Sequence, residues 1–144
     1  IDIVPELGDP LAKPIVGRGV AFADFDKNGT LDVLVTENGG SAHLYRNDTK
    51  LNNYIRINVK SIYSNRDGLS TKLVAITKSK RVERSVRTGS SFMSQSEKTV
   101  TFGLGNNNAI DSLFVYWPNG LTELYENIPS NQEITVLEQN GLIR

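Results

Sequence analysis

Apolar and polar residues alternate in short runs along most of the chain, and clusters of Gly, Asn, Asp and Ser separate these runs. A two-residue period is typical of β-strands. The clearest run is 54–60, where Ile55, Ile57 and Val59 fall on one face. The only plausible helix is a turn or two around residues 106–110. The pattern predicts strands over residues 20–25, 31–36, 42–46, 54–60, 72–78, 81–88, 98–104, 111–117, 121–125 and 133–137.

Many short strands at this spacing suggest a sandwich or a barrel. The polar, turn-rich segment 47–53 interrupts the series, and we take it as a boundary between two parts. The expected fold class is all-β. A hairpin unit over residues 1–48 precedes an antiparallel β-sandwich-like domain over residues 53–139. Residues 111–117 are apolar on both faces, which indicates a central strand.

Composition narrows the function classes. The 144 residues include 16 basic and 16 acidic side chains, so overall charge favours neither nucleic acid nor an anionic membrane as partner. No apolar run approaches the roughly 20 residues that a membrane-spanning helix needs, so we expect no membrane insertion. The chain has no cysteine, which excludes disulfides. It begins at Ile1 without an initiator methionine, and we expect it to be a fragment of a longer protein.

Residues 24–32, here called the Asp loop, contain the sharpest chemical pattern. Oxygen-bearing side chains occupy loop positions 1, 3, 5 and 9, and glycine occupies position 6. Calcium prefers six to eight oxygen ligands, and a glycine permits the bend that lets a chain wrap around the ion. Thr30, at position 7, would offer its backbone carbonyl. The predicted calcium ligands are Asp24, Asp26, Asn28, Thr30 and Asp32.

The Asp loop has two other interpretations. An EF-hand needs a bidentate Glu at position 12 and flanking helices, whereas position 12 is Val35 and the flanks alternate like strands. A metal-free polar turn with Asx hydrogen bonds is the plainer alternative. It would leave three carboxylates crowded together with only Lys27 nearby, which favours calcium.

Residues 17–36, which read GRGVAFADFDKNGTLDVLVT, resemble an FG-GAP (VCBS-type) repeat. The resemblance implies a propeller-blade-like hairpin with calcium held between its strands. One repeat cannot close a propeller, which agrees with a fragment of a larger propeller protein.

Most of residues 53–139 resemble the ASPIC/UnbV family, with Ser70-Thr71 departing from the usual Gly-Ala. The resemblance implies an extracellular, periplasmic or cell-surface setting and an interaction role, and it carries no catalytic residue. The stretches that match are 64–68, 87–96, 102–105, 111–120 and 127–129.

Catalytic signals are weak. His43 is the single histidine and has no Gly-x-Ser-x-Gly nucleophile motif near it, and a zinc site needs more His or Cys. The basic run 78–87 is interrupted by Glu83 and lacks aromatic residues, so a solvated hairpin explains it better than a polyanion site. Residues 103–106 lack the further residues of a phosphate loop. We therefore expect no enzymatic activity.

The favoured function is a non-catalytic, calcium-dependent extracellular adhesion or interaction module with a protein or glycan partner at the cell surface. The alternative is an accessory carbohydrate-binding module of a surface enzyme or uptake system. It would need an exposed aromatic platform, for which Phe114, Tyr116 and Trp117 are candidates, although such residues on an alternating strand more often fill a core. An enzyme is a third, less supported alternative.

Overall fold

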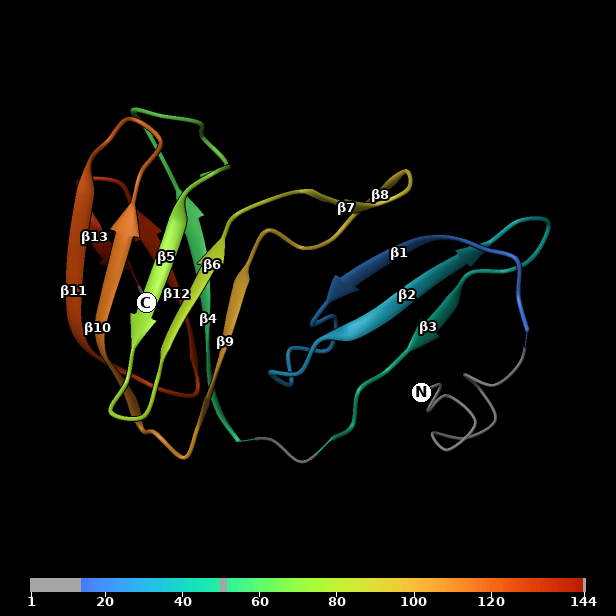
Figure 1. The fold of residues 1–144 in the computed structure, drawn as a ribbon, viewed down its shortest axis with the longest axis horizontal. Helices are drawn as coiled ribbons and strands as arrows, with labels where there is room; N and C mark the ends of the chain where they lie inside the picture. Colours follow the sequence, from blue (N-terminus) through green and yellow to red (C-terminus); the bar gives the residue numbers. More distant parts are fainter. Residues whose placement is uncertain (1–13, 50–51, 144) are drawn as a thin grey trace.

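The computed structural model describes residues 14–49 and 52–143. Every regular element in these ranges is a β-strand, which confirms the predicted all-β fold class (Figure 1). The described part of the chain has no helix long and apolar enough to cross a membrane. The strands are β1 (Gly17–Ala23), β2 (Asp32–Glu37), β3 (His43–Tyr45), β4 (Asn53–Lys60), β5 (Lys72–Ile76), β6 (Arg81–Ser85), β7 (Gly89–Ser91), β8 (Ser94–Gln95), β9 (Val100–Gly105), β10 (Ala109–Tyr116), β11 (Thr122–Pro129), β12 (Gln132–Leu137) and β13 (Gly141–Ile143).

Strands β1, β2 and β3 form an antiparallel sheet, here called the first sheet. Ala23 pairs with Asp32 at the end of the β1–β2 hairpin, so the Asp loop is the connection of that hairpin. The sheet has no large core of its own, because Phe22, Leu34 and Leu44 remain exposed. It therefore depends on the rest of the chain for support.

Two four-stranded sheets face each other and form a sandwich (Figure 1). One has the order β11-β10-β5-β6 and the other β13-β12-β4-β9. Alternating apolar residues of both sheets, among them Ile57, Leu73, Leu113 and Ile134, make one buried cluster. Each such side chain contributes about 1.5–3 kcal/mol by leaving water, so this core is the main source of stability.

The structure differs from the sequence predictions in three places. The pair β4–β12 is parallel within an otherwise antiparallel fold. The helical turn predicted around residues 106–110 is wrong: Asn107 donates its backbone N–H to the Leu104 carbonyl at 3.2 Å and closes a tight turn instead. Strands β7, β8 and β13 were not predicted, because each has three residues or fewer and no apolar alternation.

Glu138 connects two turns of the sandwich that lie far apart in sequence. Its side chain is fully buried and accepts hydrogen bonds from Asn119 Nδ2 at 2.6 Å, from Ser64 N at 3.2 Å and from the Ser61 hydroxyl. Burial raises the pKa of Glu138, but these donors outweigh burial and hold that pKa below its usual value. The turns at 64–68 and 118–120, both singled out in the sequence, thus meet on one carboxylate.

The first sheet is attached to the sandwich by the segment 91–97. Ser91 Oγ accepts from Val20 N at 3.3 Å, and Ser94 Oγ donates to the Val20 carbonyl at 2.8 Å. Glu97 N donates to the Phe22 carbonyl at 2.9 Å. This segment, which includes β8, therefore occupies the open edge of β1 (Figure 1). Whether residues 1–48 and 53–139 are separate domains stays a prediction.

Candidate metal centre

The Asp loop turns sharply between β1 and β2. Lys27 and Gly29 adopt positive φ values of 58° and 93°. A side chain at Gly29 would also lie 2.4 Å from the ring of Tyr54 on β4, so both the conformation and the space require glycine. At Gly29 the loop therefore packs closely against Tyr54 of the sandwich.

The structure brings the three predicted carboxylates together. One oxygen each from Asp24, Asp26 and Asp32 lies within 4.8 Å of the others. Asp24 and Asp32 are buried, and Asp26 is exposed. Calcium–oxygen bonds of about 2.3–2.6 Å allow ligand oxygens to be up to about 5 Å apart, so this spacing fits a calcium ion.

Backbone amides hold the two buried carboxylates in place. Asp24 Oδ1 accepts from Asn28 N at 2.9 Å, and its Oδ2 accepts from Gly29 N at 2.9 Å. Asp32 Oδ2 accepts from Phe25 N at 3.1 Å. Each carboxylate oxygen has two lone-pair sites. Asp24 Oδ2 also lies 3.0 Å from Arg56 Nη1, so a site for a cation remains on Asp24 Oδ1 and on Asp32 Oδ2, which each accept one of these N–H bonds. The hydrogen bonds therefore orient the acids without using up their capacity to bind metal.

The two uncharged predicted ligands are placed differently. Asn28 Oδ1 accepts from Thr30 N at 2.8 Å and lies 2.6 Å from Thr30 Oγ1. The Thr30 hydroxyl also lies 2.6 Å from the Asn47 carbonyl. Asn28 would have to exchange these bonds to coordinate an ion. The structure thus gathers the three acids and turns the Asn28 carbonyl toward Thr30.

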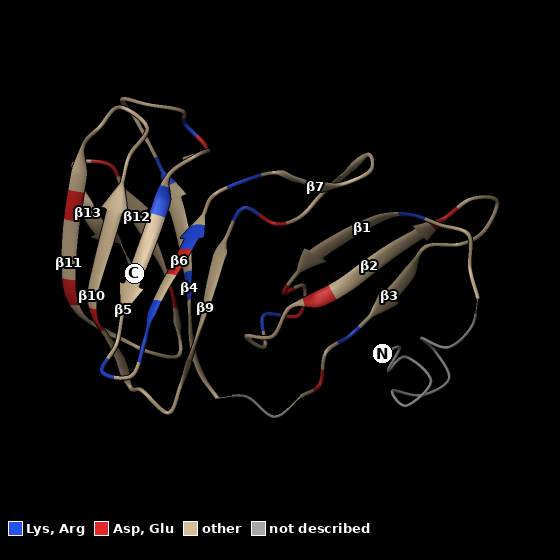
Figure 2. Cartoon of the chain, in the orientation of Figure 1, with Lys and Arg blue, Asp and Glu red and all other residues tan. Residues whose placement is uncertain are grey.

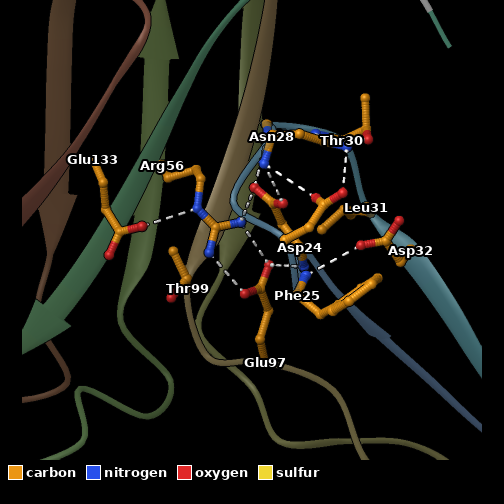
Figure 3. A network of polar contacts seen from close by, with 12 residues as sticks. Asp24, Phe25, Asn28, Thr30, Leu31, Asp32, Arg56, Glu97, Thr99 and Glu133 are labelled. Carbon is orange, nitrogen blue, oxygen red and sulfur yellow. Dashed lines mark hydrogen bonds and ion pairs between the residues drawn. The ribbon is translucent and has the colours of Figure 1, made fainter. Parts of the chain in front are cut away.

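Arg56 lies beside the loop, and sequence reasoning did not find it. From β4 its Nη1 reaches Asp24 Oδ2 at 3.0 Å, its Nη2 reaches Glu97 Oε2 at 2.9 Å, and its Nε reaches Glu133 Oε2 at 3.0 Å (Figure 3). Its side chain is 7% exposed and that of Asp24 is fully buried. A single guanidinium therefore connects the Asp loop to two strands and one loop of the sandwich.

Negative charge exceeds positive charge around Arg56 and the loop. Burial lowers the pKa of Arg56, but hydrogen bonds with Glu97 and Glu133 more than offset burial and raise that pKa. Burial raises the pKa of Glu133, and bonds from Arg56 and Asn58 reverse this and lower it. The acids are Asp24, Asp26, Asp32, Glu97 and Glu133, and the nearby cations are Arg56, Lys27 and Arg46, of which Arg46 is paired with a further acid, Asp48.

The other sequence candidates lie away from this site. His43 Nε2 is 3.5 Å from Glu37 Oε1, and its ring stacks on Tyr45. Trp117 is 3% exposed within the sandwich core and donates its indole N–H to Glu123, so it offers no platform for a sugar.

A comparison with curated proteins matches this chain to human cartilage acidic protein 1. The two are 29% identical over 136 residues, which cover 91% of this chain and 20% of that protein. The chain thus spans about a fifth of the length of this relative.

The family model described as ASPIC and UnbV matches residues 61–143. This stretch contains β5 to β13 and Glu138, and it excludes the Asp loop. The resemblance of residues 17–36 to an FG-GAP repeat therefore stays a prediction. The match covers more than half of the residues of this chain, so the chain belongs to the ASPIC and UnbV family.

Proposed function

We propose that this chain is a calcium-binding, non-catalytic interaction module of an extracellular or cell-surface protein. The observation that carries the proposal is the cluster of Asp24, Asp26 and Asp32, whose oxygens lie within 4.8 Å of one another. Hard oxygen donors at this spacing suit calcium. The excess of carboxylates over cations around them makes a bound divalent ion electrostatically favourable.

The proposed extracellular location rests on the similar proteins. ASPIC and UnbV membership and the likeness to cartilage acidic protein 1, whose name refers to cartilage, support a location outside the cell. The FG-GAP resemblance of residues 17–36 supports the first sheet as one blade-like repeat of a larger propeller protein. A propeller closes only with several such blades.

A bound calcium ion would supply positive charge and fix the three carboxylates. Hydrogen bonds and an ion pair of the chain's own residues then hold the loop in position against the sandwich. Asp32 Oδ1 accepts from Asn47 N at 2.7 Å, which holds the chain that leaves the first sheet. Asp24 pairs with Arg56 of β4. The proposed role of the site is thus structural: it sets the geometry between the first sheet and the sandwich.

Thermal unfolding in calcium, in magnesium and in chelator tests the calcium site. We expect calcium to raise the melting temperature, because a ligand bound only by the folded state adds about 2.7 kcal/mol at a hundredfold excess over its Kd. Asp26→Ala should abolish the rise. Asp26 is exposed, and within the described residues its hydrogen bonds go only to Asn28, so its loss should leave the fold intact.

Glu126→Gln is the matched control, since Glu126 is an exposed acid of β11 on the sandwich. Its calcium-induced rise should equal that of the wild type. Equal melting temperatures of the wild-type chain in calcium and in chelator would contradict the proposed site.

The carbohydrate-binding alternative has one specific observation in its favour. Phe114 and Tyr116 stack side by side on β10 with ring centroids 6.3 Å apart, and Lys72 Nζ lies 4.8 Å from the Tyr116 ring. Both rings are half-buried, so each presents only part of a face to a sugar. If this strip binds glycans, Tyr116→Ala should abolish retention on a glycan array. Unchanged retention, or no retention by the wild type, would exclude it.

A further inference from the structure

A cleft of about 540 Å³ lies between the first sheet and the sandwich. Phe22 and Leu31 line it from the first sheet and the Asp loop, and the stretch 83–85 of β6 lines it from the sandwich. Phe22 and Leu31 are 39% and 40% exposed, so both present apolar surface to a ligand. Neither the calcium site nor the sandwich core accounts for this cleft.

Two arginines give the cleft its charge. Arg84 and Arg87 line it, and neither forms an ion pair with a carboxylate among the residues that the structure describes.

The other charged residues of the cleft are already paired. Glu83 lies 3.7 Å from Lys72 and 3.6 Å from Arg81, Glu97 pairs with Arg56, and Lys98 lies 2.8 Å from Asp67. Figure 2 shows basic positions on β6 and on the segment that leads to β7.

Strand β6 also offers an open backbone edge. It is the last strand of its sheet, with β5 on one side. Thr77 and Lys80 exchange both backbone hydrogen bonds, and Val86 N donates to the Thr71 carbonyl. Hydrogen-bonded and non-hydrogen-bonded pairs alternate in an antiparallel ladder. Counting from these bonds, the N–H and C=O groups of Glu83 and Ser85 point away from β5.

The Glu83 carbonyl confirms this direction. Its hydrogen-bond donor is Arg84 Nη1, at 3.1 Å, and not a backbone amide of β5. The remaining outward groups, the N–H of Glu83 and both groups of Ser85, have no hydrogen-bond partner in the described chain. An edge with unpaired groups is a template for another strand. Here it lies beside two arginines that have no carboxylate partner in the described chain, and beside the apolar side chains of Phe22 and Leu31.

We propose that the cleft binds an extended acidic peptide segment of a partner protein, which adds to β6 as a further strand. Its backbone would pair with Glu83 and Ser85. Its carboxylates would bind Arg84 and Arg87 through charge-assisted hydrogen bonds, and its apolar residues would contact Phe22 and Leu31. The inference deepens the proposed interaction role and rests on it for the kind of partner.

Fluorescence anisotropy with a short labelled peptide of alternating glutamate and valine tests the inference. We expect saturable binding that weakens with salt and is lost when lysine replaces glutamate in the peptide. Arg84→Glu and Arg87→Glu should each weaken binding about tenfold or more. Lys78→Glu, an exposed charge reversal outside the cleft, should leave binding unchanged.

Two further arms separate strand addition from simple charge attraction. The same peptide with alternate backbone nitrogens methylated should not bind, because methylation removes its ladder donors. Amide hydrogen exchange at Ser85 should slow when the unmodified peptide binds. Equal binding of the methylated peptide, or equal losses in Arg87→Glu and Lys78→Glu, would overturn the proposal.

A heparin-derived oligosaccharide serves as the competing ligand class. If it binds through Arg84 and Arg87 and the acidic peptide does not, the cleft is an anionic glycan site and the peptide proposal is wrong. Calcium-dependent melting of the same preparations tests the calcium site independently of the cleft. If calcium raises the melting temperature but the peptide does not bind, only the peptide proposal is wrong. If the peptide binds but calcium has no effect on melting, only the proposed metal site is wrong.

Discussion

Arg56→Met is expected to lower the free energy of unfolding by about 3–5 kcal/mol. The substitution keeps much of the apolar length of the side chain and removes its charge. It leaves the fully buried Asp24 carboxylate without its ion pair, and it leaves Glu97 and Glu133 close together without the cation between them. Urea unfolding of both proteins measures the difference.

Lys60→Met is the matched control, because Lys60 is an exposed cation on the same strand. Its effect should stay within about 0.5 kcal/mol. Adding Asp24→Asn to Arg56→Met should recover part of the loss, since no unpaired charge then remains in the buried position. Similar stabilities of Arg56→Met and Lys60→Met would show that the ion pairs around Arg56 do not hold the two parts together.

Trp117→Ala is expected to destabilise the chain by about 3–5 kcal/mol. Trp117 is 3% exposed, belongs to the buried cluster of the sandwich and donates its indole N–H to Glu123. Removing it opens a large cavity and leaves the carboxylate of Glu123 without that donor. Chemical denaturation followed by circular dichroism measures the loss.

Tyr63→Ala provides the comparison, since Tyr63 is an aromatic residue with 63% exposure. Its removal should change stability by no more than about 0.5 kcal/mol. If Trp117→Ala unfolded at the same denaturant concentration as Tyr63→Ala, the side chain would not be a core residue. The carbohydrate-binding interpretation of Trp117 would then return.

The alternating pattern predicted much of the fold because burial of one face governs these strands. Ile55, Ile57 and Val59 of β4 are all buried, and β10, expected to be central, lies between β5 and β11. The three aspartates of the loop were predicted from their spacing, and they come together because a tight turn with Gly29 places alternate residues on one side.

The same reasoning could not find Arg56. Alternation places it on the face of β4 opposite the core, where solvent is expected. It is buried because the Asp loop and Glu97 cover that face, and these lie distant in sequence. The parallel pairing of β4 with β12 is likewise a long-range choice that no local pattern encodes.

The basic run 78–87 illustrates the same limit. Its composition matches a solvated hairpin, and β6 does lie at a sheet edge. The sequence carries no sign that Phe22 and Leu31 face Arg84 and Arg87 across a cleft, because the packing of the first sheet on the sandwich brings them together.

The most direct test of the account is a calorimetric titration of the metal-free chain with calcium, in parallel with Asp26→Asn. We expect one calcium ion bound per chain and a binding isotherm that is lost or strongly weakened in Asp26→Asn. Absence of binding by the wild-type chain, or an unchanged isotherm in Asp26→Asn, would contradict the assignment of the Asp loop as a calcium site.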